Sequence, residues 1–268
     1  MFTGIVAAIG EIERVEPLGE QAGVRLYLAP GKLDLSDVAQ GDSIAIQGAC
    51  MTVVSLQDGG FAVDVSQESL RRTVGLGAAG PVNLEKAMRL SDRIGGHLVS
   101  GHVDGMGVVR RFEPVGESHL LEILAPAELA RYLVYKGSIT VNGVSLTVNR
   151  VEDLPVAEVL EPAWGIAAQA VLAGQEPRLT QSPGAVRSPR AEQALPAGQA
   201  CECCAFQANL IPHTVAVTTL KQLVPGALVN LEIDQVARYL SRMHEVDARQ
   251  HTGSLAAWAG RGIEDDKA

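Results

Sequence analysis

The sequence predicts an all-β protein of two tandem six-stranded barrels followed by a C-terminal α-helix. Three observations predict this fold: an internal duplication, short β-prone runs separated by glycine-containing turns, and a helical hydrophobic pattern near the end of the chain. The 268 residues are 47% hydrophobic and 20% charged, which is close to the average for globular proteins. A chain of this length and composition can bury a sizeable core.

The duplication is seen in two blocks. Residues 4–20 and 101–117 are identical at eight of 17 positions when they are aligned at an offset of 97. Residues 43–54 and 138–149 share five residues at an offset of 95. Self-similarity of this kind indicates two copies of one structural unit.

A third repeated block shows that the second copy carries an insertion. The tetrapeptide VNLE occurs at 82–85 and again at 229–232, so the offset has risen by about 50 residues. Residues 152–206 are rich in proline and alanine without a strand or helix period, which predicts a flexible, poorly packed loop with one short helix possible within 156–173. The predicted organisation is a first barrel over 1–97, a second over 98–233, a helix over 234–250 and a tail over 251–268.

Within each copy the local signals are mostly those of strands. In the first copy, residues 44–46, 51–54 and 61–65 are β-prone runs bounded by turn residues. Their expected counterparts in the second copy are 139–141, 146–148 and 215–217. A short helix is predicted over 127–135. A longer helix is predicted after Asp234, its expected N-cap, with apolar residues spaced three and four apart: Val236, Tyr239, Leu240, Met243 and Val246.

Charge and cysteine content exclude several classes of protein. Lys and Arg number 22 against 31 Asp and Glu, and the net charge of −9 argues against a nucleic-acid-binding protein. No apolar run is long enough to cross a bilayer, and no basic segment precedes an apolar one at the N-terminus. Four cysteines form no disulfide framework. We therefore expect a cytoplasmic protein that binds neither membranes nor nucleic acid.

Two motifs that resemble ligand sites favour structural interpretations. Residues 75–80 fit the pattern G-x-G-x-x-G, but Pro81 and an extended segment follow where a dinucleotide-binding helix would begin, so a glycine-rich turn is expected. Cys201, Cys203 and Cys204 are too closely spaced for a structural zinc site and are expected to be unstructured thiols. No metal site is predicted.

The repeated block 43–54/138–149 carries a more specific signal. Residues two apart point to one face of a strand, so Cys50 and Thr52 project together in the first copy and Ser145 and Thr147 in the second. These pairs suit a polar ligand, although a barrel rim with solvated side chains has the same pattern. His102 replaces Ile5 of the first copy, which indicates a role for one copy only. Lys136 stands where the first copy has Gln40 and is either a ligand contact or a solvated lysine.

Six blocks in fixed order then carry a resemblance to a known family. The blocks are MFTGIV, GDSIAIQGACMTV, GGHLVSGHVDG, YKGSITVNGVSLTV, NLIPHTVAVTTL and VNLEID, and together with their surroundings they cover about 210 residues. They closely resemble riboflavin synthase of the alpha-chain type, which is built of two lumazine-binding repeats. The resemblance implies two six-stranded Greek-key barrels and a C-terminal helix through which three chains associate as a homotrimer.

The resemblance also implies a reaction. Two molecules of 6,7-dimethyl-8-ribityllumazine would dismutate, one donating a four-carbon unit to the other, to give riboflavin and 5-amino-6-ribitylaminouracil. Members of the family use no metal or redox cofactor. The productive site would form between the first barrel of one chain and the second barrel of a neighbour.

By analogy with the family, two pockets and a set of catalytic residues are expected. The first pocket would be lined by Gly4, Ile5, Val6, Cys50, Met51, Thr52, Asp64, Val65, Ser66, Gln67, Glu68 and Ser69. The second would be lined by Gly101, His102, Val103, Lys136, Ser145, Leu146, Thr147, Asn209, Leu210, Ile211, Pro212, His213 and Thr214. The residues expected to act in catalysis are Phe2, Ser43, Cys50, His102, Ser145 and Thr147.

Two other functions remain compatible with this architecture. A protein of the same fold could bind a lumazine or flavin without converting it, or could keep the barrels only as a scaffold. Retention of Cys50, His102, Lys136, Ser145 and Thr147 together favours the enzyme.

Overall fold

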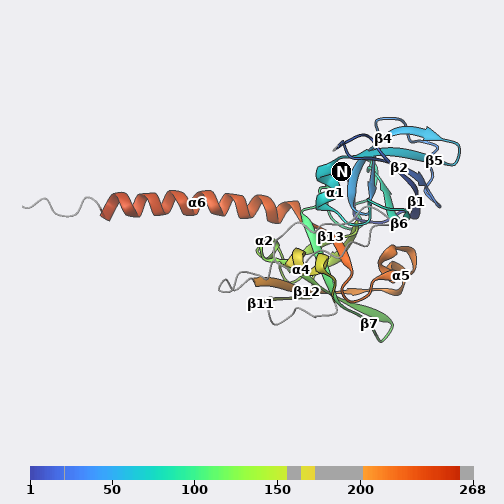
Figure 1. Ribbon diagram of the computed structural model, residues 1–268. Coiled ribbons are helices and arrows are strands. Elements are labelled where there is room, and N and C mark those ends of the chain that lie inside the picture. The colour runs from blue at the N-terminus through green and yellow to red at the C-terminus, as the bar shows by residue number, and fades with distance from the viewer. Residues whose placement is uncertain (21, 156–163, 173–201, 260–268) are drawn as a thin grey trace, which may run out of the picture.

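The computed structural model describes residues 1–20, 22–155, 164–172 and 202–259. Two β-domains lie side by side, and a long helix projects away from them (Figure 1). The described strands outnumber the short helices within both domains, so the predicted all-β class is confirmed.

The first copy folds into a closed six-stranded antiparallel barrel, as predicted. Its strands follow the order β1-β2-β5-β4-β3-β6 around the barrel. Alternate residues fill the interior, as in β2, where Val24, Leu26 and Leu28 are buried. A short helix, α1 (Gln67–Arg72), connects β5 to the last strand. The strand bounds are β1 (Ala8–Pro17), β2 (Val24–Ala29), β3 (Ser43–Ile46), β4 (Ala49–Gln57), β5 (Gly60–Val65) and β6 (Gly80–Lys86).

The second copy repeats this arrangement with one strand broken in two. Its sheet has the order β10-β9-β13-β7-β8-β12-β11, so its two end strands are neighbours in the chain, separated by Val148 and Asn149. Together β10 and β11 occupy the position that the single strand β4 has in the first copy. The bounds are β7 (Gly105–Val115), β8 (Ser118–Pro126), α2 (Ala127–Ala130), β9 (Ser138–Val141), β10 (Val144–Thr147), β11 (Arg150–Pro155), β12 (Glu202–Leu210), α5 (Pro212–Val217), the 3-10 helix η1 (Thr219–Gln222) and β13 (Leu228–Ile233).

One strand of the second copy was predicted in the wrong place. The counterpart of β5 is β12, whereas residues 215–217 lie in α5, the counterpart of α1. Val215 and Val217 favour strands by propensity, but Pro212 occupies the first turn of a helix, where a missing backbone N–H costs nothing. The strand propensity of these valines is therefore outweighed by the helix that begins at Pro212, at the position of α1 in the first copy.

The inserted segment is shorter than predicted, and part of it is well packed. Residues 152–155 belong to β11 and residues 202–206 to β12, so both ends of the predicted loop are strand. The helix α4 (Ile166–Leu172) lies within the expected range 156–173, but it is not poorly packed. Trp164 and Val171 are buried with it against β-strand residues such as Met106 and Leu124. Residues 156–163 and 173–201 lie outside the described residues.

The cysteines at the start of β12 are also ordered, which corrects their prediction as unstructured thiols. Cys204 lies in the interior of the second barrel, and Cys203 lies on the outer face beneath α4. Because neighbours in a strand point to opposite faces, these two thiols cannot bind one metal ion together. Burial raises the pKa of the Cys204 thiol to about 12. Cys201 lies outside the described residues.

The two barrels meet along a buried polar contact that obeys a pseudo-twofold relation. The Asn83 side-chain amide donates to the Asn142 carbonyl oxygen at 2.8 Å, and that of its repeat counterpart, Asn230, donates to the Gln47 carbonyl oxygen at 2.9 Å. All four residues are buried. This paired set of hydrogen bonds fixes the orientation of one barrel against the other, because an unmade bond at a buried site is costly.

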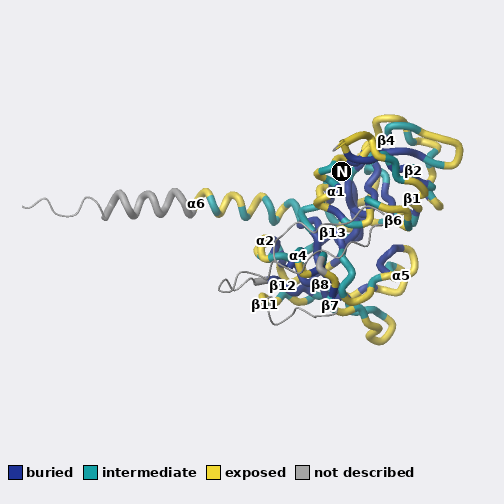
Figure 2. Tube along the Cα trace, in the orientation of Figure 1, coloured by how far each residue is buried: buried dark blue, intermediate teal, exposed yellow. Residues whose placement is uncertain are grey.

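The C-terminal helix α6 (Gln235–Ala259) begins where the sequence predicts and extends past residue 250. The Asp234 carboxylate accepts a hydrogen bond from the Val236 amide at 2.8 Å, as expected of an N-cap. Figure 2 shows that the described part of the helix is mostly exposed or half-buried, and its apolar residues Tyr239 and Met243 are exposed. No helix within the described ranges is long and apolar enough to span a membrane.

Candidate active site

The two copies exchange the segments that precede their first strands. The Gly4 carbonyl, before β1, accepts a hydrogen bond from the Ser145 amide of β10 at 2.7 Å. The Gly101 carbonyl, before β7, accepts one from the Cys50 amide of β4 at 2.8 Å. The start of each copy therefore lies against the polar strand of the other copy. Each candidate site is built from both halves of the chain.

Two buried glutamates hold these exchanged segments. Glu85 on β6 is 8% exposed and accepts hydrogen bonds from the Thr3 amide and hydroxyl, both at 2.7 Å, and from the Gly4 amide at 3.1 Å. Glu232 on β13 is 2% exposed and makes the equivalent bonds to the Ser100 amide, the Ser100 hydroxyl and the Gly101 amide at 2.7, 2.6 and 2.9 Å. Burial raises the pKa of both carboxyl groups, and these hydrogen bonds oppose the increase.

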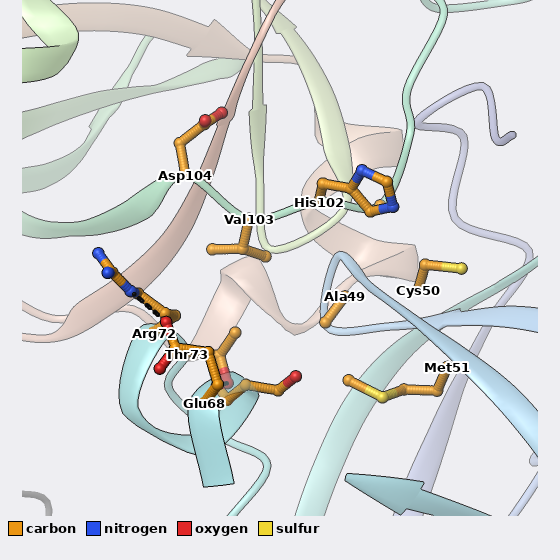
Figure 3. A pocket seen from close by; sticks show the side chains of 11 residues that line it. Ala49, Cys50, Met51, Glu68, Arg72, Thr73, His102, Val103 and Asp104 are labelled. Carbon is orange, nitrogen blue, oxygen red and sulfur yellow. Dashed lines mark hydrogen bonds and ion pairs between the residues drawn. The ribbon is translucent and has the colours of Figure 1, made fainter. Parts of the chain in front are cut away.

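The first site is a cavity of about 410 Å³ between β4, α1 and the segment that precedes β7. Cys50 and His102 both line it, and the Arg72 guanidinium is paired with the Glu68 carboxylate at 3.0 Å across the turn of α1 (Figure 3). The remaining lining residues are Ala49, Met51, Ser69, Thr73, Gly101, Val103 and Asp104.

The composition of this cavity corrects the predicted assignment of residues to pockets. The sequence placed Gly4, Ile5 and Val6 in the first pocket and residues 101–103 in the second. The structure shows residues 101–103 in the first cavity and Gly4 against Ser145 in the second copy. The exchange cannot be read from a single sequence, because it depends on which barrel each connecting segment crosses.

The second site follows from the same exchange. Ser145 replaces Cys50, and Ile5 stands where the first site has His102. Glu68 and Arg72 of α1 are replaced by His213 and Val217 of α5. Ile5 and Val217 are exposed, so this site has two apolar side chains at positions where the first has His102 and Arg72.

A histidine that was not among the predicted site residues contacts Ser145. His97 Nδ1 lies 2.8 Å from Ser145 Oγ, and His97 Nε2 lies 3.2 Å from Thr140 Oγ1. Burial lowers the pKa of the imidazole below its ordinary value, and the charge of Asp234 opposes this decrease. Nothing in the repeat marks His97, because at an offset of 97 it has no counterpart in the first copy.

Some predicted catalytic residues lie away from the first cavity. Phe2 is fully buried, and its backbone pairs with Val99 through hydrogen bonds of 2.7 and 3.0 Å. Ser43 lines a separate depression of about 560 Å³ together with Lys86 and Arg89. Phe2 therefore anchors the linker, and Ser43 faces a different surface.

The comparisons with known proteins agree with this geometry. A family model described as the lumazine binding domain matches residues 3–87 and 100–162. Riboflavin synthase of Photobacterium leiognathi is 35% identical over 249 residues, which cover 92% of this chain and 90% of the relative. Riboflavin synthase of Mycobacterium bovis is 37% identical over 247 residues, which cover 91% of this chain and 98% of the relative. The chain belongs to the riboflavin synthase family of lumazine-binding proteins.

Solved structures confirm the fold of this family member. The structure of LumP complexed with riboflavin has a TM-score of 0.61 at 19% identity and covers 87% of this chain and 99% of that chain. The structure of LumP complexed with 6,7-dimethyl-8-(1'-D-ribityl) lumazine has a TM-score of 0.58 at 19% identity. These similarities support the two-barrel architecture.

The other predicted residues of the first site serve α1 and its surroundings. Ser66 caps α1 by accepting a hydrogen bond from the Ser69 amide at 3.0 Å. Asp64 is bound by the Arg25 guanidinium at 2.7 and 2.9 Å, which lowers the pKa of its carboxyl. Thr52 is exposed, Val65 is buried and Gln67 opens α1.

Lys136 lies in the turn that precedes β9, the strand that pairs with the Ser145 strand β10. Its amide donates to the Val148 carbonyl, as that of Gly41 does to Val53, so its counterpart is Gly41 and not Gln40. The Lys136 ammonium donates to the Asn149 side chain at 3.1 Å and is exposed. The predicted lysine is thus held close to the end of β10, and Thr147, the last residue of that strand, is also exposed.

The last predicted group leads from β12 into α5. Asn209 and Leu210 end the strand, and Ile211 is the residue before α5. Pro212 opens the helix and Thr214 accepts the Thr218 hydroxyl at its carbonyl oxygen at 2.7 Å, as Ser69 accepts that of Thr73 in the first copy. These residues therefore form the wall of the second site that α1 forms in the first.

Proposed function

We propose that this protein is a riboflavin synthase, a transferase that moves a four-carbon unit between two molecules of 6,7-dimethyl-8-ribityllumazine. The products are riboflavin and 5-amino-6-ribitylaminouracil. The observation that carries the proposal is the pair of sites related by the exchange of segments, one around Cys50 and one around Ser145. A reaction of two identical substrates requires two related binding sites, and the similarity to named riboflavin synthases supports this use of them.

The protein contributes mainly positioning and hydrogen bonds to this reaction. The substrate provides its own acidic C7 methyl group, so the enzyme has to hold two ring systems in contact and stabilise a developing anion. In the first site the thiol of Cys50 and the imidazole of His102 line one cavity, where His102 assists proton transfer. In the second, Ser145 delivers or activates the nucleophile that adds to C7, with Thr147 on the same strand face.

The proposal includes a homotrimer joined through α6. The apolar side chains of Val236, Tyr239 and Met243 are exposed on a helix that projects from the two barrels (Figure 1). Exposed apolar surface of this kind is typical of an interface. Tyr135 and Ile211 are also exposed near the second site, which supports completion of that site by the first barrel of another chain.

A direct assay tests the function. Purified protein is mixed with dimethylribityllumazine without any added cofactor, and riboflavin is followed by absorbance. Production of riboflavin supports the enzyme. Tight binding without product would instead show a carrier protein, and neither binding nor product would show that the barrels serve another purpose.

The Ser145→Ala variant tests the second site. We expect turnover to fall by about tenfold to a hundredfold with an unchanged circular dichroism spectrum, since one hydrogen-bonding group at the reacting centre is lost. The matched control is Ser118→Ala, at the distant β7–β8 turn, which should keep the wild-type rate. An unchanged rate for Ser145→Ala would remove Ser145 from the mechanism.

A further inference from the structure

The repeat supplies a histidine to only one of the two sites. His102 lines the first cavity, and the corresponding position beside Ser145 is occupied by Ile5. The second site is nevertheless contacted by His97, which belongs to the linker between the copies and not to the repeat. One linker therefore carries a histidine to each site, His97 at one end and His102 at the other.

The linker backbone leaves His97 little freedom to move. The His97 amide donates to the Thr3 carbonyl at 3.2 Å. Gly96 is packed so closely that an added Cβ would lie 2.3 Å from the Thr3 carbonyl oxygen and 2.8 Å from Ser145 Oγ. A side chain at residue 96 would displace the segment, so this glycine allows the next residue, His97, to lie directly over Ser145.

His97 bridges two residues that face each other across neighbouring strands. Ser145 on β10 is paired in register with Thr140 on β9, and the imidazole reaches one hydroxyl with each ring nitrogen. In the first copy the equivalent pair is Cys50 and Ala45, which contact the apolar residues Phe2 and Val99. A hydroxyl held by an imidazole is thus specific to the second site.

We propose that His97 is a positioning residue for Ser145 in the second site. The neutral imidazole donates a hydrogen bond from Nε2–H to Thr140 Oγ1 and accepts a hydrogen bond from the Ser145 hydroxyl at Nδ1. The Ser145 proton is then directed away from the ligand, and the lone pairs of Oγ are free to accept a hydrogen bond from the substrate or from an attacking water. Thr140 is 1% exposed, and its hydroxyl lies within hydrogen-bond distance of Nε2, so it holds the imidazole from the buried side. The expected effect on turnover rests on the proposed function, whereas the contacts of His97 with Ser145 and Thr140 do not.

Three variants of His97 separate positioning from a purely structural role. In His97→Asn the side-chain oxygen can occupy the place of Nδ1 and accept the Ser145 proton, whereas in His97→Gln the polar end corresponds to Nε2 and reaches Thr140 instead. We expect kcat to fall by about tenfold or more in His97→Ala and His97→Gln, to recover most of that loss in His97→Asn, and KM to change by less than about threefold in all three. The control, His119→Asn on β8, should keep the wild-type kcat.

Wild-type kcat in His97→Ala, or equal losses in the Asn and Gln variants, would overturn the proposal. If His97→Ala does not fold, the comparison of Asn with Gln decides. The tautomer is tested without turnover by nitrogen NMR of histidine-labelled protein, in which the signals of His97 are those absent from His97→Asn. An unprotonated Nδ1 supports the proposal and a protonated Nδ1 at neutral pH overturns it, even if the wild-type protein binds dimethylribityllumazine without producing riboflavin.

Discussion

At the scale of single residues, two glycines make the exchange of segments possible. Gly4 and Gly101 have φ angles of +73° and +80°, which L-residues with a side chain rarely adopt. A Cβ added at Gly101 would lie 2.6 Å from the Cβ of Cys50, and one at Gly4 would lie 2.6 Å from the Cβ of Ser145. Each glycine therefore sets the distance between a connecting segment and the polar strand of the other copy.

The Gly101→Ala variant should disrupt the first site more than the fold. The added methyl group has to push Cys50 or the linker away, which moves His102 relative to the cavity. We therefore expect kcat/KM for dimethylribityllumazine to fall by about tenfold or more. Gly116→Ala is the matched control, because Gly116 also has a positive φ of 60° but has no atom within 4 Å of an added Cβ. It should lose about 1 kcal/mol of stability and no activity. Equal activity of the two variants would contradict the role assigned to the Gly101 contact.

Single residues also show the limit of sequence reasoning about the site. Cys50, His102 and Ser145 could be selected because they recur in, or depart from, the repeat. His97 carries no such signal, and Glu85 and Glu232 recur in the repeat without any sign of their role, since that role depends on contacts between segments distant in sequence. The repeated VNLE marked an element common to both copies, but it did not show that its glutamate is buried and holds the segment that precedes the first strand of the same copy.

At the scale of elements, α4 is the departure of this chain from a plain pair of barrels. Trp164 is 7% exposed and lies over the turn that precedes β13, where a Cβ added at Gly226 would be 2.9 Å from the indole ring. Together with Val171 and Leu172 it buries Met106 and Leu228 on the outer face of the second barrel. The helix thus covers an apolar surface of the barrel and is itself ordered by that contact.

The Trp164→Ala variant tests whether this cover stabilises the second barrel. We expect the free energy of unfolding, measured by urea denaturation, to fall by about 3 kcal/mol, because a nearly buried aromatic side chain leaves a cavity. Leu90→Ala, which removes an apolar side chain that is fully exposed, should change stability by less than about 0.5 kcal/mol. A loss in Trp164→Ala no larger than that of the control would show that α4 is only loosely attached.

The elements themselves were predictable where the repeat and the local signals agreed. Three strands of the first barrel, β3, β4 and β5, and the start of α6 follow from β-prone runs, turn glycines and the cap at Asp234. The same reasoning failed at β12, because composition made residues 202–206 look like a continuation of the insertion, and at α5, because its valines favour a strand. Pairing with β8 decides the structure of β12, and the helix start at Pro212 decides that of α5. Neither can be recognised from a few neighbouring residues in the sequence.

At the scale of the whole molecule, the two barrels are held together by paired interactions that follow the pseudo-twofold relation. Asn83 and Asn230 join the barrels in the interior, and Glu85 and Glu232 hold the two exchanged segments. Both glutamates are buried, and the hydrogen bonds that hold their carboxylates come from backbone amides and hydroxyl groups of these segments. Burying these two carboxylates opposes folding. The hydrogen bonds that they accept, however, hold in place the segments that complete both sites.

Comparing the pH dependence of stability between the wild type and Glu85→Gln should reveal the cost of burying the Glu85 carboxylate. Because burial raises the folded-state pKa of Glu85 above its unfolded value, the contribution of this group to stability is greatest when it is protonated and decreases as pH rises through the unfolded and then the folded pKa. The substituted side chain would not titrate, yet its amide oxygen can still accept from Thr3. Urea denaturation of both proteins between about pH 4 and pH 7 should therefore show the stability difference moving in favour of the variant as pH rises. The matched comparison is Glu13→Gln on an exposed part of β1, which removes the same negative charge from a side chain that lies in solvent. A difference for Glu85→Gln that moved in the opposite direction would mean that the hydrogen bonds from Thr3 and Gly4 outweigh the desolvation of the carboxylate.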